Sequence, residues 1–526
     1  MRFLIGIDIG TTGAKTVIFD LTGTVVWSAY REYACSYPRP NWVEQDSDLL
    51  VARSMEATQE AVAASGIDPA EVAAVSFSTQ RTCTHFLDAR GQLVRPMISW
   101  QDNRAVEELA FIQKALGQGR FYAQNKLSPG AIWIVNKILW LRNHEPEQWK
   151  RVRRIAQLQD YFLRAYGADG YWTDTSDAGL FGCRDLYGNC WSDEICGALG
   201  IDKEMLPTVV PSGTVVGEIT AAVAEKTGLA AGTPIVVGAG DQNAAAVGAG
   251  VIETGMMSVS LGTGGLAAAF VNRPLEATAK DAMLTAHPIP GHYLLEGYQP
   301  AGASSLRWFR DEISRCWFRE EQTSPVLCTN AAREGEIYGI LDALAAGAPA
   351  GSKGLVVNPY FASAGTPRWN ADARAVITGL TFAHDRACLV RAFMEGITLD
   401  VKDMIRSMSQ CGVPIETVRI LGGPTKSALW NQIQADVYGR PVTTLRVTDA
   451  AALGAAICAG VGVGVFADIP EGVRRMVRTD KTLEPVSKNI ALYEELYGIF
   501  CDVYEGLSSK VFGRLARFQE HHQTTQ

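Results

Sequence analysis

The chain has 526 residues, of which 47% are hydrophobic and 20% charged, and its formal net charge is −8. This length exceeds what one hydrophobic core supports and predicts two domains, while the acidic balance gives no electrostatic reason to expect nucleic acid or a membrane as a partner. Asp8 interrupts the first apolar run too early for a signal peptide, and the 11 cysteines lack zinc-ligand spacing. We therefore expect a cytoplasmic protein with reduced thiols.

A strand–turn–strand pattern opens the chain. Apolar residues 4–9 lead into Gly-Thr-Thr-Gly at 10–13, and a second apolar run ends at residue 20. The pattern predicts a β-hairpin, whose tip is either an ordinary turn or a set of N–H groups and hydroxyls for a phosphate. Asp8 stands two residues before the turn and suits Mg²⁺, usually held through water. Lys15, on the outgoing strand, either reaches the same phosphates or is a solvated strand-edge lysine.

Polar residues follow the next predicted strands. Residues 41–66 are predicted to form a helix that Asp46 or Ser47 can cap, and residues 132–141 a second helix. The strands predicted at 72–77 and 97–100 both end in polar clusters. Because α/β folds place ligands at the carboxyl ends of strands, both clusters are candidate binding segments.

The strand predicted at 234–240 ends in Gly-Asp-Gln, directly before a helix predicted at 243–249. Asp241 is therefore either the cap of that helix or a functional carboxylate at a strand end. The residues alone leave both interpretations open.

The opening pattern recurs half a chain later. Residues 256–265 repeat the apolar strand and the Gly-Thr turn, with Gly262 at the place of Gly10 and Thr263 at the place of Thr11, an offset of 252 residues. Two such tips facing each other across a cleft could hold a polyphosphate from both sides. The recurrence therefore favours the phosphate interpretation of both hairpins.

The remaining pattern alternates strands and helices. A strand at 418–421, a Gly-Gly turn and a helix at 426–438 form a unit in which a flat ligand can approach the backbone closely. Asp385 is predicted to cap a long core helix, and the Ala- and Gly-rich stretch 450–467 is predicted to be a buried helix with a Gly-rich turn. The chain is therefore expected to form two α/β domains, 1–248 and 249–505, with a tail at 506–526 whose polar end from Arg514 frays.

The chain lacks both the GxxxxGK[ST] loop and a GxGxxG that opens a helix, which disfavours a P-loop or dinucleotide fold. It resembles instead the FGGY family of carbohydrate kinases, over about residues 3–505. The resemblance rests on the ordered motifs DIGTT at 8–12, QR at 80–81, GDQ at 240–242, SLGTG at 260–264 and GG at 422–423. It implies two actin-like ATPase (ribonuclease-H-like) domains flanking a catalytic cleft, ATP and Mg²⁺ as cofactors, and a small sugar or polyol as the acceptor.

The resemblance also implies a role for each matching residue. Asp241 matches the catalytic base, and Asp8 the Mg²⁺-linked carboxylate. Sugar contacts are expected from Gln80, Arg81, Trp100, Asp241 and Gln242. Nucleotide contacts are expected from Gly10, Thr11, Thr12, Lys15, Gly262, Thr263, Gly264, Gly422, Gly423 and Ser427, with 302–308 on the other side of the adenosine.

Several positions depart from the motifs of individual subgroups. Pro424 stands where xylulokinase-like members have a third glycine, which alters the predicted adenosine loop, and Thr82 replaces an acidic contact of glycerol kinases. The expected acceptor is a ketopentose such as xylulose, with erythritol, glycerol, ribulose and the autoinducer-2 precursor as alternatives. A chaperone-like or filament-forming ATPase and a phosphate hydrolase on the same scaffold are the other classes considered, and a homodimer is expected only from the base rate among enzymes.

Overall fold

The computed structural model describes residues 2–117, 119–128, 130–275, 282–314, 317 and 331–523. The chain divides into two compact units, each built from three segments. The first unit consists of Met1–Thr254, Phe270–Leu295 and Val447–Arg478, and the second of Gly255–Ala269, Glu296–Arg446 and Thr479–Gln526. Both contain β-sheets and helices, in agreement with the predicted α/β class.

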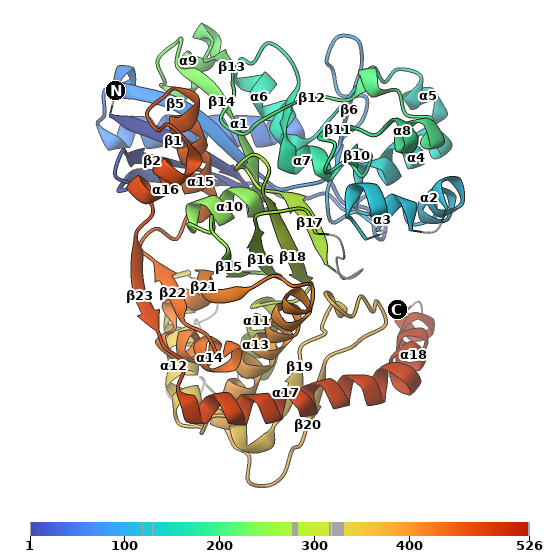
Figure 1. The fold of residues 1–526 in the computed structure, drawn as a ribbon, viewed down its shortest axis with the longest axis vertical. Helices are drawn as coiled ribbons and strands as arrows, with labels where there is room; N and C mark the ends of the chain where they lie inside the picture. The colour runs from blue at the N-terminus through green and yellow to red at the C-terminus, as the bar shows by residue number, and fades with distance from the viewer. Residues whose placement is uncertain are drawn as a thin grey trace. The chain divides into compact units, whose positions relative to one another are not determined.

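A six-stranded sheet forms the centre of the first unit (Figure 1). β1 pairs antiparallel with β2 and parallel with β5, so the hairpin strand and the strand that leads to residues 80–81 end at the same edge. In sheet order the strands are β13 (Val215–Glu218), β14 (Pro234–Gly240), β5 (Val72–Thr79), β1 (Phe3–Ile9), β2 (Gly13–Asp20) and β3 (Val25–Glu32).

Helices cover both faces of this sheet. One face packs against α1 (Ser47–Ser65), α6 (Leu158–Tyr166) and α9 (Ala221–Thr227), and the other against α10 (Asp241–Gly248), α15 (Ala450–Gly462) and α16 (Ile469–Met476). Asp46 caps α1 as predicted, because its carboxylate accepts from the N–H groups of Asp48 and Leu49. The stretch 450–467 contains the predicted buried helix.

Smaller elements of the first unit surround a separate apolar cluster, and α4 lies at its centre. The helices are α2 (Glu108–Leu116), α3 (Arg120–Asn125), α4 (Ile134–His144), α5 (Pro146–Trp149), α7 (Thr175–Gly179) and α8 (Asp193–Leu199). The strand pairs are β4 (Glu44–Gln45) with β7 (Met97–Ile98), β6 (His85–Leu87) with β8 (Arg154–Ala156), β9 (Trp172–Asp174) with β12 (Thr208–Val210), and β10 (Arg184–Asp185) with β11 (Cys190–Trp191).

The second sheet repeats the antiparallel hairpin beside a parallel strand: β15 pairs antiparallel with β16 and parallel with β21. Its order is β17 (Met283–Ala286), β18 (Tyr293–Gln299), β16 (Gly265–Val271), β15 (Gly255–Leu261), β21 (Ile415–Gly422), β22 (Val442–Leu445) and β23 (Thr479–Leu483). A separate pair joins β19 (Val356–Asn358) and β20 (Val376–Thr378). The predicted recurrence of the hairpin is therefore present in the fold.

The helices of the second unit are α11 (Ser304–Trp308), α12 (Ala331–Ala346), α13 (Arg386–Gln410), α14 (Ala428–Tyr438), α17 (Ser487–Leu507) and α18 (Gly513–Gln523). The Asp385 carboxylate accepts from the N–H of Cys388 and caps α13 as predicted. Among the described residues, no helix is both long enough and apolar enough to cross a membrane.

Two features differ from the sequence-based expectation. The two units are not continuous stretches of the chain. α15 packs on β1, β5 and β14, and the segment 447–478 therefore belongs to the first unit. The predicted domain boundary at residue 248 is not tested by this division into compact units, and it stays a prediction. The prediction that the chain frays from Arg514 was wrong for the described residues, because α18 continues to Gln523. Phe512 and Ala516 are buried, so apolar contacts stabilise this end of the chain.

Candidate active site

The tip of the first hairpin presents N–H groups and keeps its carbonyls occupied. The hydroxyl of Tyr33 donates to the Gly10 carbonyl at 2.7 Å, and its N–H donates to the Thr12 carbonyl at 3.1 Å. The amide of Gln45 donates to the Thr11 carbonyl at 2.9 Å. Among the described residues, the N–H groups of Thr11 and Thr12 have no partner. The tip therefore offers donors to an anion, as a phosphate site requires.

Acidic and basic side chains lie beside this tip. The Ser78 hydroxyl donates to Asp8 at 2.9 Å, and burial raises the pKa of Asp8 to about 7, with the nearby charges of Asp241 and Asp449 acting in the same direction. Lys15 lies 2.6 Å from Asp449 (Nζ to Oδ1). The interpretation of Lys15 as an edge-strand lysine is wrong, because β3 pairs with the outer side of β2.

Asp241 follows the last residue of β14 and is the first residue of α10. The helix cap is Gly240, so the cap interpretation of Asp241 does not hold. The Asp241 carboxylate accepts from the N–H of Gln242 at 2.8 Å and from its side-chain amide at 3.2 Å, and it pairs with Arg81 at 3.3 Å. The Asp241 side chain is 30% exposed, against 12% for Arg81, so the carboxylate is open to a ligand.

Arg81 is held from two further directions. It donates to the Asn243 carboxamide oxygen at 3.1 Å, and Asn243 in turn donates to the hydroxyl of Thr285 and the carbonyl of Ala286 on β17. A Cβ added to Gly240 would lie 2.6 Å from Cδ of Arg81. Glycine at position 240 therefore makes the space in which the arginine side chain lies beside Asp241.

The two other expected sugar contacts lie against the hairpin. Gln80 is buried and its amide donates to the Gln45 carboxamide oxygen at 2.8 Å, while its own oxygen has no partner among the described residues. The Trp100 indole donates to the Thr11 hydroxyl at 3.0 Å. The structure thus brings Gln80 and Trp100 to the phosphate hairpin, and Arg81 and Gln242 to Asp241.

The second hairpin has the same chemistry at its tip. The Thr263 carbonyl accepts from the N–H of Gly302 at 2.9 Å and from the Ser304 hydroxyl at 2.6 Å, and the N–H of Gly262 donates to the Gly264 carbonyl. Within the described part of the chain, the N–H groups of Thr263 and Gly264 have no partner. This tip, too, presents donors, and the carbonyls of Thr263 and Gly264 are satisfied.

The Gly-Gly turn after β21 is shaped by close backbone packing. Gly422 has φ +91°, and a Cβ there would lie 2.9 Å from the carbonyl carbon of Leu261, whereas the space beside Gly423 is open. Ser427 caps α14, because its hydroxyl accepts from the N–H of Trp430 at 3.0 Å. The hydroxyl of Ser427 is therefore already engaged, and its contact with adenosine stays a prediction.

Two family models match the chain. The N-terminal domain of the FGGY family of carbohydrate kinases matches residues 3–248, and the C-terminal domain of that family matches residues 257–463. The chain belongs to the FGGY family of carbohydrate kinases. It is therefore an ATP-dependent phosphotransferase, and kinases of this family use ATP together with a divalent metal.

Relatives of this kinase align over nearly their whole length. A xylulose kinase of Bacillus subtilis is 27% identical over 505 residues, which are 96% of this chain and 97% of that protein. A glycerol kinase of Bordetella parapertussis is 30% identical over 501 residues, covering 92% and 93%. The crystal structure of a ligand-bound xylulose kinase from Lactobacillus acidophilus has a TM-score of 0.86 at 25% identity, covering 98% and 100%. The kinase therefore has the actin-like ATPase fold.

Two residues at the site of this kinase were missed from the sequence. Asp449, the partner of Lys15, stands 434 residues further along the chain, and its position before α15 suggested only a helix start. Asn243 connects Arg81 to β17, whereas the sequence marked it only as the first residue of a predicted helix. Their placement depends on the packing of α15 and β17, which no local pattern contains.

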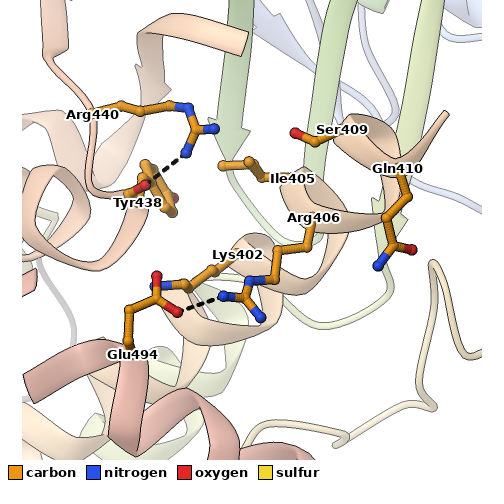
Figure 2. A pocket seen from close by; sticks show the side chains of 8 residues that line it. All are labelled: Lys402, Ile405, Arg406, Ser409, Gln410, Tyr438, Arg440 and Glu494. Atoms are coloured by element: carbon orange, nitrogen blue, oxygen red, sulfur yellow. Dashed lines mark hydrogen bonds and ion pairs between the residues drawn. The ribbon is translucent and has the colours of Figure 1, made fainter. Parts of the chain in front are cut away.

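A separate cavity of about 480 Å³ lies in the second unit, and none of the predicted site residues lines it. Figure 2 shows Arg406 beside Glu494, and Arg440 beside Tyr438. Lys402 donates to the Val437 carbonyl and to Glu494, while Arg440 donates to the Tyr438 carbonyl at 3.0 Å. These cations satisfy the last carbonyls of α14 and one carboxylate, so we assign no ligand to this cavity.

Proposed function

We propose that this kinase transfers the γ-phosphate of ATP to a hydroxyl of a ketopentose such as xylulose, with Asp241 as the general base. The observation that carries the proposal is the placement of the Asp241 carboxylate: partly exposed, at the end of β14, and close enough to Asp8 to influence its pKa. A base must be reachable by the acceptor hydroxyl and close to the phosphate site. Asp241 meets both requirements within the first unit.

The neighbours of Asp241 suit it to accept a proton. The Gln242 N–H and Arg81 both direct hydrogen onto its oxygens, which fixes the orientation of the carboxylate. In the proposed reaction the sugar hydroxyl gives its proton to Asp241 while its oxygen forms a bond to the γ-phosphorus. The bond from that phosphorus to the β–γ bridging oxygen breaks, and ADP leaves.

Binding of Mg·ATP is proposed to use the two hairpin tips and Asp8. Oxygen ligands and a small number of carboxylates suit Mg²⁺, which takes its other ligands from water and substrate phosphates. In the described part of the chain, no cluster of three or more acidic, histidine or cysteine side chains could hold a metal alone, so Asp8 and ligand phosphates are the proposed donors. When bound, the metal offsets negative charge on the phosphate oxygens. Lys15, whose ammonium pairs with Asp449, is proposed to contact the phosphates at the first tip.

The choice of a ketopentose is supported by the relatives. Five proteins named xylulose kinase, from species of Bacillus, Staphylococcus and Lactococcus, are 26–28% identical to this chain. A glycerol kinase is 30% identical, and a structure of a gluconate kinase from Lactobacillus acidophilus has a TM-score of 0.86. Glycerol and gluconate therefore belong in the test beside xylulose, ribulose, erythritol and the autoinducer-2 precursor.

The test measures ADP formation from Mg·ATP with each acceptor, first with the wild-type protein. We expect a rate that rises strongly with one ketopentose. A rate that rises with none of the acceptors would refute the proposed substrate class. A rise confined to glycerol or gluconate would reassign it.

The role of Asp241 is tested by Asp241→Asn. The variant should remain folded and lose on the order of 10²–10⁴-fold in kcat, because the acceptor hydroxyl then lacks a base. Asp193→Asn is the matched control, since Asp193 is likewise the first residue of a helix but is exposed and pairs with Lys203 on the surface. Near-normal kcat in Asp241→Asn would refute its assignment as the base.

A further inference from the structure

A fully buried lysine joins the two segments that carry the proposed sugar contacts. Lys137 on α4 is completely inaccessible to solvent, and its ammonium donates to the Thr82 carbonyl at 2.6 Å and to the Ser99 carbonyl at 2.9 Å. Thr82 follows Arg81 directly, and Ser99 directly precedes Trp100. The Lys137 side chain therefore connects the backbone next to Arg81 with the backbone next to Trp100.

Packing alone does not explain a lysine at this position. The neighbouring α4 residues Ile134, Ile138 and Leu141 are fully buried and apolar, so an apolar side chain would fill the core equally well. Burial lowers the pKa of Lys137 to about 8, which reflects the cost of removing its charge from water. The nearby Cys83 and Asp102 favour its ammonium form, and its hydrogen bonds to the two carbonyls offset part of the cost of burial.

The turn after Arg81 needs such support. Thr82 has φ +57°, in the left-handed region that a β-branched residue seldom adopts. Its N–H donates to the Gln157 carboxamide oxygen at 2.9 Å, and its carbonyl accepts from Lys137. Both backbone polar groups of this strained residue are thus held by buried side chains, which fixes the direction in which Arg81 leaves the strand.

The second segment is held in the same way. The Ser99 carbonyl accepts from Lys137, and the next residue, Trp100, donates its indole N–H to Thr11 on the hairpin tip. A change in the position of Ser99 would therefore shift Trp100 relative to Arg81.

We propose that Lys137 is a positioning residue that sets the spacing between Arg81 and Trp100, and with it the fit of the sugar. This inference rests on the proposed function, because it takes Arg81 and Trp100 as the walls of the acceptor site. Lys137 touches neither substrate; it acts through the two carbonyls. Its loss should therefore weaken use of the sugar more than use of the nucleotide.

The test is Lys137→Met, with KM measured separately for the acceptor identified in the panel and for Mg·ATP. We expect the sugar KM to rise on the order of tenfold or more, since displacements near 1 Å have large effects on positioned substrates, and the KM for Mg·ATP to stay within about twofold. Lys137→Gln, which keeps a donor without the charge, should recover part of the sugar affinity.

Lys402→Met is the matched control. Lys402 is also buried and also donates to a backbone carbonyl, that of Val437, but it lies in the second unit, on α13. We expect this variant to lower Tm and to leave both KM values unchanged.

Four outcomes would overturn the inference. They are an unchanged sugar KM in Lys137→Met, an equal rise in both KM values, the same sugar effect from Lys402→Met, or the failure of both Lys137 variants to fold. A wild-type protein that uses no acceptor of the panel would overturn the proposed function and this inference together. A sugar-dependent wild type with an unaffected Lys137→Met would overturn the inference alone.

Discussion

Substituting Gly454 by alanine should disable this kinase without changing any residue of the proposed site. Gly454 lies on α15 where that helix crosses α10, and a Cβ at this position would overlap the carbonyl oxygen of Ala244 and lie 2.6 Å from its carbonyl carbon. Non-bonded carbon atoms normally approach to about 3.5–4.0 Å. One helix must therefore move by about 1 Å relative to the other, because a backbone carbonyl cannot rotate away as a side chain can.

The effect should appear in both stability and turnover. Overpacking of a close-packed interior costs about 1–3 kcal/mol. α10 begins at Asp241, and Asp449 precedes α15, so a shift between the helices displaces the proposed base relative to the Lys15–Asp449 pair. A displacement near 1 Å can cost on the order of 10²-fold in rate.

The assay compares Gly454→Ala with Gly498→Ala by thermal unfolding and by kcat with the acceptor that the wild type uses. Gly498 lies in α17 and has no atom within 4 Å of an added Cβ. Alanine there should be neutral or should stabilise the protein by about 0.5–1 kcal/mol, since glycine is a poor helix former. Wild-type Tm and kcat in Gly454→Ala, or equal damage from both substitutions, would refute the reasoning.

Two further predictions concern stability. The buried His287 donates from Nε2 to the Val251 carbonyl and accepts at Nδ1 from the N–H of Ile289. Burial lowers the pKa of His287 to about 3, against the opposite effect of the bond to Val251. Because the unfolded chain binds this proton near pH 6.5, the stability that neutral His287 contributes is present above pH 6.5 and is lost as the pH falls toward 3, at about 1.4 kcal/mol per pH unit. Urea titrations should therefore show a smaller loss of unfolding free energy between pH 6.5 and 4.5 in His287→Gln than in the wild type. Parallel pH curves for the two proteins would contradict this. Glu395 accepts from Arg391, the Gly351 N–H, Ser352 and the Tyr493 hydroxyl. Glu395→Ala should cost about 3–5 kcal/mol in urea unfolding by leaving a buried guanidinium without its carboxylate, and a loss below about 1 kcal/mol would contradict it.

The local elements of this kinase could be predicted because their causes are local. The Gly-Thr turns predict both hairpins, Asp46 and Asp385 predict the starts of α1 and α13, and the apolar runs predict β5 and β14 within two residues. Turn geometry and helix capping involve residues only a few positions apart, so the sequence states them directly. The recurrence after 252 residues predicts that the two hairpins bind one kind of ligand, and this stays a prediction.

Short stretches of sequence thus account for both hairpins, for β5 and β14, and for the starts of α1 and α13. Long-range packing is what brings Lys15 to Asp449, Asn243 to Arg81, and Lys137 to two carbonyls 38 and 55 residues away. It also decided that α15 returns to the first sheet, where Gly6 lies against the backbone of Ala452. These contacts depend on how apolar faces and small residues pack across long separations, and that packing is a property of the whole core, which no short window of sequence contains.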